Sequence, residues 1–167
     1  MSRHQINADD LHTLYVLIGK AIWLLQHVED ALSTAITIKH EIKTRGSMSA
    51  AQAEAILAKH RRNTLGTSLR ISRDAGLFAA QLKGRLDKFR EERDWLVHRS
   101  VHQNGADLYE DDKRLEVMCR IEAFSEEALA LQKAVESDLE QFGEAQGVKK
   151  EWVLAHAQQQ IRKLRGA

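Results

Sequence analysis

The chain has 167 residues, enough for one domain with a sizeable core, and its 25 Lys and Arg residues nearly balance 24 Asp and Glu residues. The formal net charge of +1 excludes a global electrostatic attraction to nucleic acid or membranes, so any such binding must come from a local patch. The sequence has no proline and is rich in strong helix formers, which excludes a turn-rich β protein. We expect an all-α fold in one domain (residues 1–167), a bundle of about four long helices with a short C-terminal helix.

The expected location follows from cysteine usage and hydropathy. The single cysteine, Cys119, cannot form an internal disulfide, and the N-terminus has no signal-peptide pattern. The most apolar run, residues 14–25, contains Lys20 and is shorter than the roughly 20 residues that span a bilayer. We therefore expect a cytoplasmic protein with no membrane-spanning segment and no membrane partner.

Residues 7–46 predict a long first helix. Asn7 followed by Asp10 is typical of a helix N-cap with an acidic first turn, and Gly46 marks the end. Apolar residues recur between them at helical spacing: Leu11, Tyr15, Ile18, Ile22, Leu25, Leu32 and Ile36. Glu29 interrupts this stripe, so a carboxylate is expected on the side of the helix that faces the core.

Ser49 and Gln52 form a capping box that predicts a second helix from residue 49 to about residue 71, with a break at residues 74–76. This region carries a basic run, extended by Arg70 and Arg73: Lys59, His60, Arg61 and Arg62. A solvated helix face is the simpler interpretation, and a weak RNA-binding track through Lys59, Arg61 and Arg62 is the alternative. The run contains no aromatic residue, so it does not indicate stacking on bases.

The third helix is predicted over residues 77–102, and a charge lies on its apolar side. Its stripe contains Leu82, Leu86, Phe89, Leu96 and Val97, with Arg93 in the middle. A buried arginine is costly unless it is paired or opens onto a polar cleft, so we predict an interhelical pair between Glu29 and Arg93. Such a pair either sets the register of the two helices or belongs to an active site, where perturbed charged groups are common.

Asp94, His98 and His102 lie four residues apart on the same helix. Asp94 can therefore accept a hydrogen bond from the His98 ring and fix its tautomer, which makes His98 a candidate acid/base group. The alternative is a solvated polar face with incidental histidines. On a regular helix Arg93 and His98 point roughly 140° apart. A common site for both needs the reach of Arg93, a local distortion of the helix, or a second protomer.

The remaining sequence predicts a surface loop over residues 104–112 and two more helices. The fourth helix has apolar residues at strict helical spacing: Val117, Ile121, Phe124, Ala128, Leu131, Val135, Leu139 and Phe142. After Gly143 and Gly147, residues 149–164 predict a short last helix. No zinc-ligand cluster, Walker loop or dinucleotide fingerprint is present in the sequence, so we expect no metal and no cofactor.

The segment from Arg93 to His98 resembles the signature of the HEPN superfamily (higher eukaryotes and prokaryotes nucleotide-binding). That signature is an arginine, a polar residue and a histidine a few positions later; here the polar residue is Asp94 and four residues intervene. The motif lies near the end of the third helix, where the family places it. Residues 18–32 resemble the family's first helix with its inward acidic residue, and residues 64–66 resemble a turn of its second helix. The resemblance covers a core of about residues 10–142, and the C-terminal helix (about 149–164) lies outside it.

The resemblance implies a metal-independent endoribonuclease that works as a homodimer, in which both chains bring Arg93 and His98 to a shared cleft. His98 would take the proton of the RNA 2′-hydroxyl or donate one to the leaving 5′-oxygen, and Arg93 would stabilise charge on the phosphate. Asp94 would hold His98, and Arg99 or His102 would bind flanking phosphates. Such enzymes occur in bacterial toxin–antitoxin and antiphage systems, so an antitoxin or other regulatory protein is an expected partner.

Two other function classes fit the same chain. A non-catalytic HEPN-like module would bind RNA, a nucleotide or a partner protein, although the intact motif favours the enzyme. A plain interaction bundle would be supported by exposure of Trp23, Trp95 or Trp152. The exposure of these tryptophans and an assay of RNA cleavage therefore separate the three hypotheses.

Overall fold

The computed structural model describes residues 6–166, and all regular secondary structure in this range is helical, which confirms the all-α prediction. Three continuous helices are long: α1 (Ala8–Ile36) with the π-helical turn η1 (Thr37–Ile42), α4 (Ala80–Asp94) with the π-helical turn η2 (Trp95–Arg99) and α5 (Ser100–Asn104), and α6 (Asp111–Ala145). The shorter elements are α2 (Ala50–His60), α3 (Leu65–Asp74), the 3-10 turn η3 (Asp107–Tyr109) and α7 (Lys150–Leu164). None of the described helices is long and apolar enough to cross a membrane.

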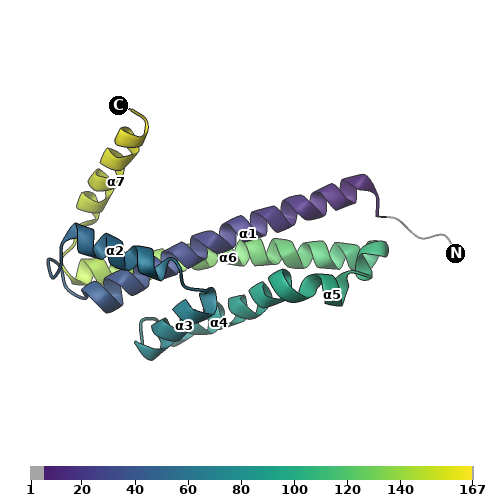
Figure 1. Cartoon of the computed structure of the whole chain (residues 1–167), viewed down its shortest axis with the longest axis horizontal. Coiled ribbons are helices and arrows are strands. Elements are labelled where there is room, and N and C mark those ends of the chain that lie inside the picture. The colour runs from purple at the N-terminus through teal and green to yellow at the C-terminus, as the bar shows by residue number, and fades with distance from the viewer. Residues whose placement is uncertain (1–5, 167) are drawn as a thin grey trace.

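The long helices form the body of the molecule. α1 and α6 lie side by side and run in the same direction, whereas the helix made of α4, η2 and α5 runs along α6 in the opposite direction (Figure 1). α3 contacts both α1 and α4, and α2 contacts the C-terminal part of α1 and η1. α7 projects away from this body beyond the C-terminal end of α6 (Figure 1).

The core lies where the apolar sides of α1, α3, α4, η2 and α6 meet. Phe89 of α4 stacks on Phe124 of α6 with ring centroids 4.5 Å apart, and both rings are buried. The other large buried side chains are Leu14, Leu25, Val28, Leu32, Leu65, Leu69, Leu86, Trp95, Leu96, Val117, Ile121, Leu131 and Val135. The stripe predicted for the fourth helix supplies much of this core, whereas that of the first helix supplies Leu25, Leu32 and Ile36. Tyr15 and Val97, which were predicted on the core-facing stripes, are exposed.

The predicted second helix is in fact two helices. α2 ends at His60, whose side chain is buried. The Nε2 atom of His60 lies 3.1 Å from a Glu41 carboxylate oxygen, and its Nδ1 atom lies 3.2 Å from the Asn63 amide nitrogen. Thr64 then starts α3, because its hydroxyl accepts a hydrogen bond from the Thr67 backbone N–H at 3.2 Å. The cap at Thr64 therefore interrupts a segment whose hydrophobic pattern alone suggested one helix. The predicted caps at Asn7 and Ser49 are confirmed.

Candidate functional site

The turn η2 brings Arg93 and His98 together within one chain. In this π-helical segment the Ser100 N–H donates to the carbonyl oxygen of Trp95, five residues earlier. A π turn holds more residues than an α turn, so side chains five positions apart come onto one face. Arg93 Nη1 consequently lies 3.3 Å from His98 Nε2. Of the three ways in which these residues could share a site, the local distortion of the helix is the one found.

Asp94 contacts Arg93 and not His98, so the predicted Asp94–His98 hydrogen bond is wrong. Arg93 Nη1 donates to Asp94 Oδ1 at 3.0 Å, and Arg90 Nε lies 3.9 Å from the other carboxylate oxygen. The reason is again η2: the wide turn that aligns His98 with Arg93 moves His98 out of line with Asp94. In this arrangement Asp94 orients the guanidinium.

The predicted Glu29–Arg93 pair is also wrong as a direct contact. Among residues 6–166 no hydrogen bond or salt bridge joins the two side chains, because the Arg93 guanidinium is turned toward Asp94 and His98. The two charges still influence each other. Burial raises the pKa of the Glu29 carboxyl, and the positive charge of Arg93 and the backbone N–H of Leu65 act in the opposite direction.

Arg93 is a largely buried cation with unused hydrogen-bonding capacity. Its side chain is 22 % exposed, and its Nε atom is buried without a hydrogen-bond partner among the described residues. Unpaired buried donors are rare in folded proteins because they lose the hydrogen bonds that water would give them. The buried Nε is out of reach of a ligand, so an anionic oxygen from outside the chain can meet the guanidinium only through its exposed part, with His98 beside it.

The Trp95 indole holds η2 in place. Its Nε1 donates to Asn104 Oδ1 at 2.9 Å, and the Asn104 amide donates to Asp107 at 2.8 Å. The guanidinium of Arg120 on α6 lies 3.7 Å from the Trp95 ring centroid and makes two hydrogen bonds, of 2.7 and 2.9 Å, with Glu92. This support could not be predicted from the sequence, because no spacing along the chain links Trp95 to a residue of α6.

The remaining predicted site residues lie outside this contact. Arg99 is exposed and donates to the Glu91 carbonyl oxygen at 3.5 Å, and His102 is exposed on α5. Both belong to the same continuous helix as Arg93 and His98. They can therefore meet a ligand that extends along this helix, although neither contacts the Arg93–His98 pair.

The basic run is exposed at Lys59, Arg61 and Arg62, and an RNA-binding track through these residues stays a prediction. Arg61 binds Asp30 of α1 at 2.6 Å, which fixes α2 to α1, and the adjoining His60 is buried. This arrangement agrees with the simpler interpretation, a structural and solvated helix face.

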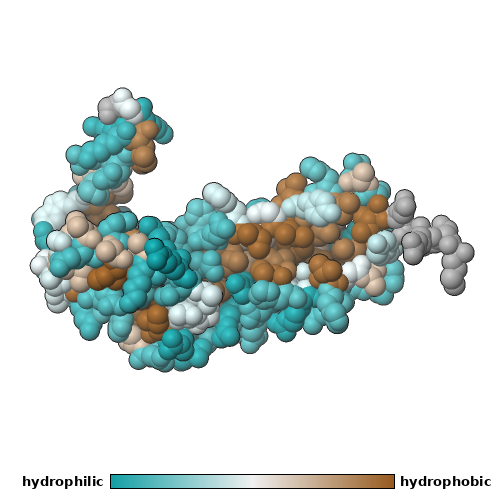
Figure 2. All heavy atoms as spheres, viewed as in Figure 1, coloured by the Kyte–Doolittle hydropathy of each residue, from teal (hydrophilic) through white to brown (hydrophobic). Residues whose placement is uncertain are grey.

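A hydrophobic surface extends over the half of the molecule that contains η2 and α5. Figure 2 shows it as a brown strip over the part of the bundle away from α7. The exposed large apolar residues on this half are Tyr15, Val16, Trp23, Val97, Val101, Tyr109 and Leu115. Val97 and Val101 are close neighbours of His98 in the sequence. An apolar strip of this kind on a surface marks an interaction site in soluble proteins.

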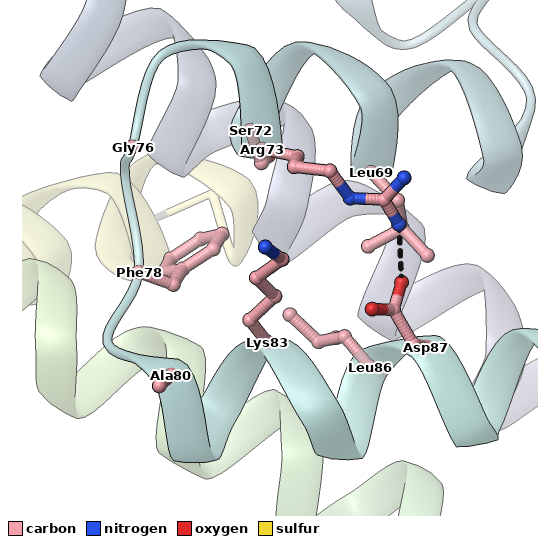
Figure 3. Close-up of a pocket in the computed structure, with 9 residues that line it drawn as sticks. All are labelled: Leu69, Ser72, Arg73, Gly76, Phe78, Ala80, Lys83, Leu86 and Asp87. Carbon is pink, nitrogen blue, oxygen red and sulfur yellow. Dashed lines mark hydrogen bonds and ion pairs between the residues drawn. The ribbon is translucent and has the colours of Figure 1, made fainter.

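The cavity between α3 and α4 is separate from the predicted site residues (Figure 3). It has a volume of about 220 Å³ and lies between the end of α3 and the start of α4. Arg73 on its wall is bound to Asp87 at 2.7 Å, and none of the candidate residues lines it. Within the described part of the chain, no group of His, Cys, Asp or Glu residues is arranged to hold a metal ion.

Comparisons with known proteins give no match: no family model fits the chain, and no curated protein or solved structure is significantly similar to it. A guanidinium can bind a phosphate, and an imidazole beside it can take up or release a proton during a reaction. Trp23 and Trp152 are exposed whereas Trp95 is buried, so two of the three tryptophans also remain open to a partner.

Proposed function

We propose that the chain is a metal-independent endoribonuclease of HEPN type that cleaves RNA through its 2′-hydroxyl. The observation that supports this most directly is the 3.3 Å approach of Arg93 Nη1 to His98 Nε2, produced by the π-helical turn η2. Wide helical turns of this kind are frequently found at functional sites. The side chains of Arg93 and His98, both required by the chemistry, thus lie on one face of the helix, although a separation of five residues would point them apart on a regular α-helix.

In the proposed reaction the 2′-oxygen attacks the adjacent phosphorus, and the bond from phosphorus to the 5′-oxygen breaks. A histidine takes the proton of the 2′-hydroxyl, and the departing 5′-oxygen receives a proton from a second acid. Arg93 stabilises the charge that grows on the non-bridging phosphate oxygens, and Asp94 orients its guanidinium. Because the nucleophile belongs to the substrate, no metal-bound water is needed.

The reaction requires both a base and an acid, whereas each chain places one histidine beside Arg93. An isologous homodimer would supply the second, with His98 of one chain as base and His98 of the other as acid. Val97 and Val101, which are exposed and close to His98 in the sequence, provide an apolar surface for this dimer. An antitoxin or other regulatory protein would compete for the same surface.

The test compares the wild type with His98→Ala on labelled single-stranded RNA in the presence of EDTA. Wild type should leave 2′,3′-cyclic or 3′-phosphate ends and spare DNA, because DNA has no 2′-hydroxyl. His98→Ala should lower the cleavage rate at least about 100-fold, the lower range for loss of a general acid or base, while largely preserving RNA affinity.

The matched control is His156→Ala, which removes an exposed histidine from the projecting helix α7. It should cleave at the wild-type rate. Equal cleavage by wild type and His98→Ala would contradict the role of His98. RNA binding without cleavage by the wild type would instead support the non-catalytic binding module.

A further inference from the structure

α7 is a helix without a packing partner along most of its length. All residues of Lys150–Leu164 are exposed, and the helix extends away from the body of the molecule (Figure 1). An isolated helix of about 15 residues is only marginally stable in water, so helices of this length depend on packing. A surface that covers α7 would therefore stabilise it.

The apolar residues of α7 follow the spacing of a two-helix interface. Leu154, Ala157, Ile161 and Leu164 occur at alternating steps of three and four residues, as the core positions of a heptad repeat do. Figure 2 shows the corresponding hydrophobic surface on one side of α7. The pattern favours another helix as the partner.

The charge of α7 is opposite to that of the rest of the chain. Residues 149–165 contain five Lys and Arg and one Glu, whereas residues 1–148 contain 20 Lys and Arg and 23 Asp and Glu. Three of the five cations, Arg162, Lys163 and Arg165, are at the distal end of α7. This end is therefore suited to an acidic surface.

An acidic groove lies at the other end of α7, where the helix joins the body. The groove has a volume of about 370 Å³. Its apolar lining residues are Ile38, Leu139, Val148, Val153 and Leu154, and its charged lining residues are Glu136, Glu140, Glu144 and Lys150. Lys150 at the start of α7 lies 3.3 Å from Glu140. Among residues 6–166 no salt bridge involves Glu136 or Glu144, so the groove suits a further apolar residue with a basic neighbour.

We propose that α7 pairs with α7 of a second copy of this chain in antiparallel orientation. In such a pair Leu154 faces Leu164 of the second copy, and Ala157 faces Ile161. The distal end of each helix then lies beside the base of the other, so that Leu164 enters the groove of the second copy. The distal cations meet the glutamates of that groove, whereas a parallel pair would bring the cations of both helices together.

The orientation is tested by disulfide formation between two different chains. In a Cys119→Ser background, one chain carries Ala157→Cys and the other carries Ile161→Cys. Mild oxidation of the mixture should link the two kinds of chain to each other far more than either to itself, because antiparallel pairing sets position 157 opposite position 161. Equal linking of each chain with itself, as a parallel pair would give, would overturn the proposal, as would no linking.

The matched control places Ala155→Cys and Gln159→Cys, in separate chains of the same background, on the opposite side of α7. This mixture should remain unlinked, and linking equal to that of the first mixture would mean that random collisions account for both.

A second measurement follows the strength of association. Sedimentation equilibrium of Ile161→Glu/Leu164→Glu should show the α7 contact weakened about 100-fold or more, since two apolar interface residues are lost from each chain. Ala155→Glu/Gln159→Glu adds the same charge on the other side of α7 and should associate as the wild type does. Equal association of both double variants would overturn the proposal. Binding of wild type to phosphatidylglycerol-containing vesicles without self-association through α7 would overturn it in favour of a membrane surface.

Discussion

The half-buried carboxyl of Glu29 makes the stability of the fold depend on pH. Burial raises the pKa of Glu29 above its ordinary value despite the opposing charge of Arg93. An acid with a raised pKa in the folded state stabilises the fold below its unfolded pKa, and this contribution is lost as pH rises through the folded pKa. At neutral pH the ionised Glu29 therefore weakens the fold.

We expect Glu29→Gln to raise the free energy of unfolding at pH 7 by about 0.5–1 kcal/mol, a value discounted for solvent screening of a partly exposed group. The advantage over wild type should disappear at a pH below about 4, where a glutamate is protonated. Urea unfolding at several pH values measures both effects. A direct Glu29–Arg93 pair would instead predict a loss of about 3–5 kcal/mol for Glu29→Ala. A loss of that size would show that the two side chains pair in solution.

Turns and caps explain which elements could be predicted from the sequence. Asn7, Ser49 and the apolar stripes were sufficient for α1, the start of α2 and α6, because caps and helical periodicity are local properties. The turn at residues 61–64 was missed because Thr64 caps a new helix inside an unbroken helical composition. η2 was missed as well, because a π-helical turn leaves no distinct pattern in one sequence. Arg93 and His98 could thus be selected from the sequence, whereas their contact and the actual partner of Asp94 could not.

Asn104 should be required for the geometry of η2. Asn104→Ala removes the acceptor of the buried Trp95 N–H and the donor to Asp107, so we expect a loss of about 1–3 kcal/mol in the free energy of unfolding. Amide hydrogens of α5 should exchange faster, and RNA cleavage should fall although His98 is intact. Gln103→Ala changes an exposed neighbour and should leave all three measurements unchanged. If both variants behave alike, Trp95 does not position η2 through Asn104.

At the scale of the whole molecule, the proposed active site depends on a contact between two chains. Val101 is 86 % exposed, so Val101→Asp should not affect folding of one chain, but it should weaken a homodimer formed through η2 and α5. Measured in the Ile161→Glu/Leu164→Glu background, which lacks the proposed α7 contact, the variant should sediment as a monomer and lose cleavage activity. Leu129→Asp, on α6, is the control. A dimer that persists in Val101→Asp would place the interface elsewhere.

The parallel arrangement of α1 and α6 also has a consequence for biosynthesis. α1 is translated first, but Val28, Leu32 and Ala35 in its core side are fully buried only when the other core helices, above all α6 beside it, are in place. Contacts between distant parts of a chain form slowly, and the nascent chain exposes apolar surface until they form. Translation that stops before residue 111 would release a fragment with this surface uncovered. Such fragments should aggregate or be degraded by cellular proteases, so functional protein appears only when synthesis of α6 is nearly complete.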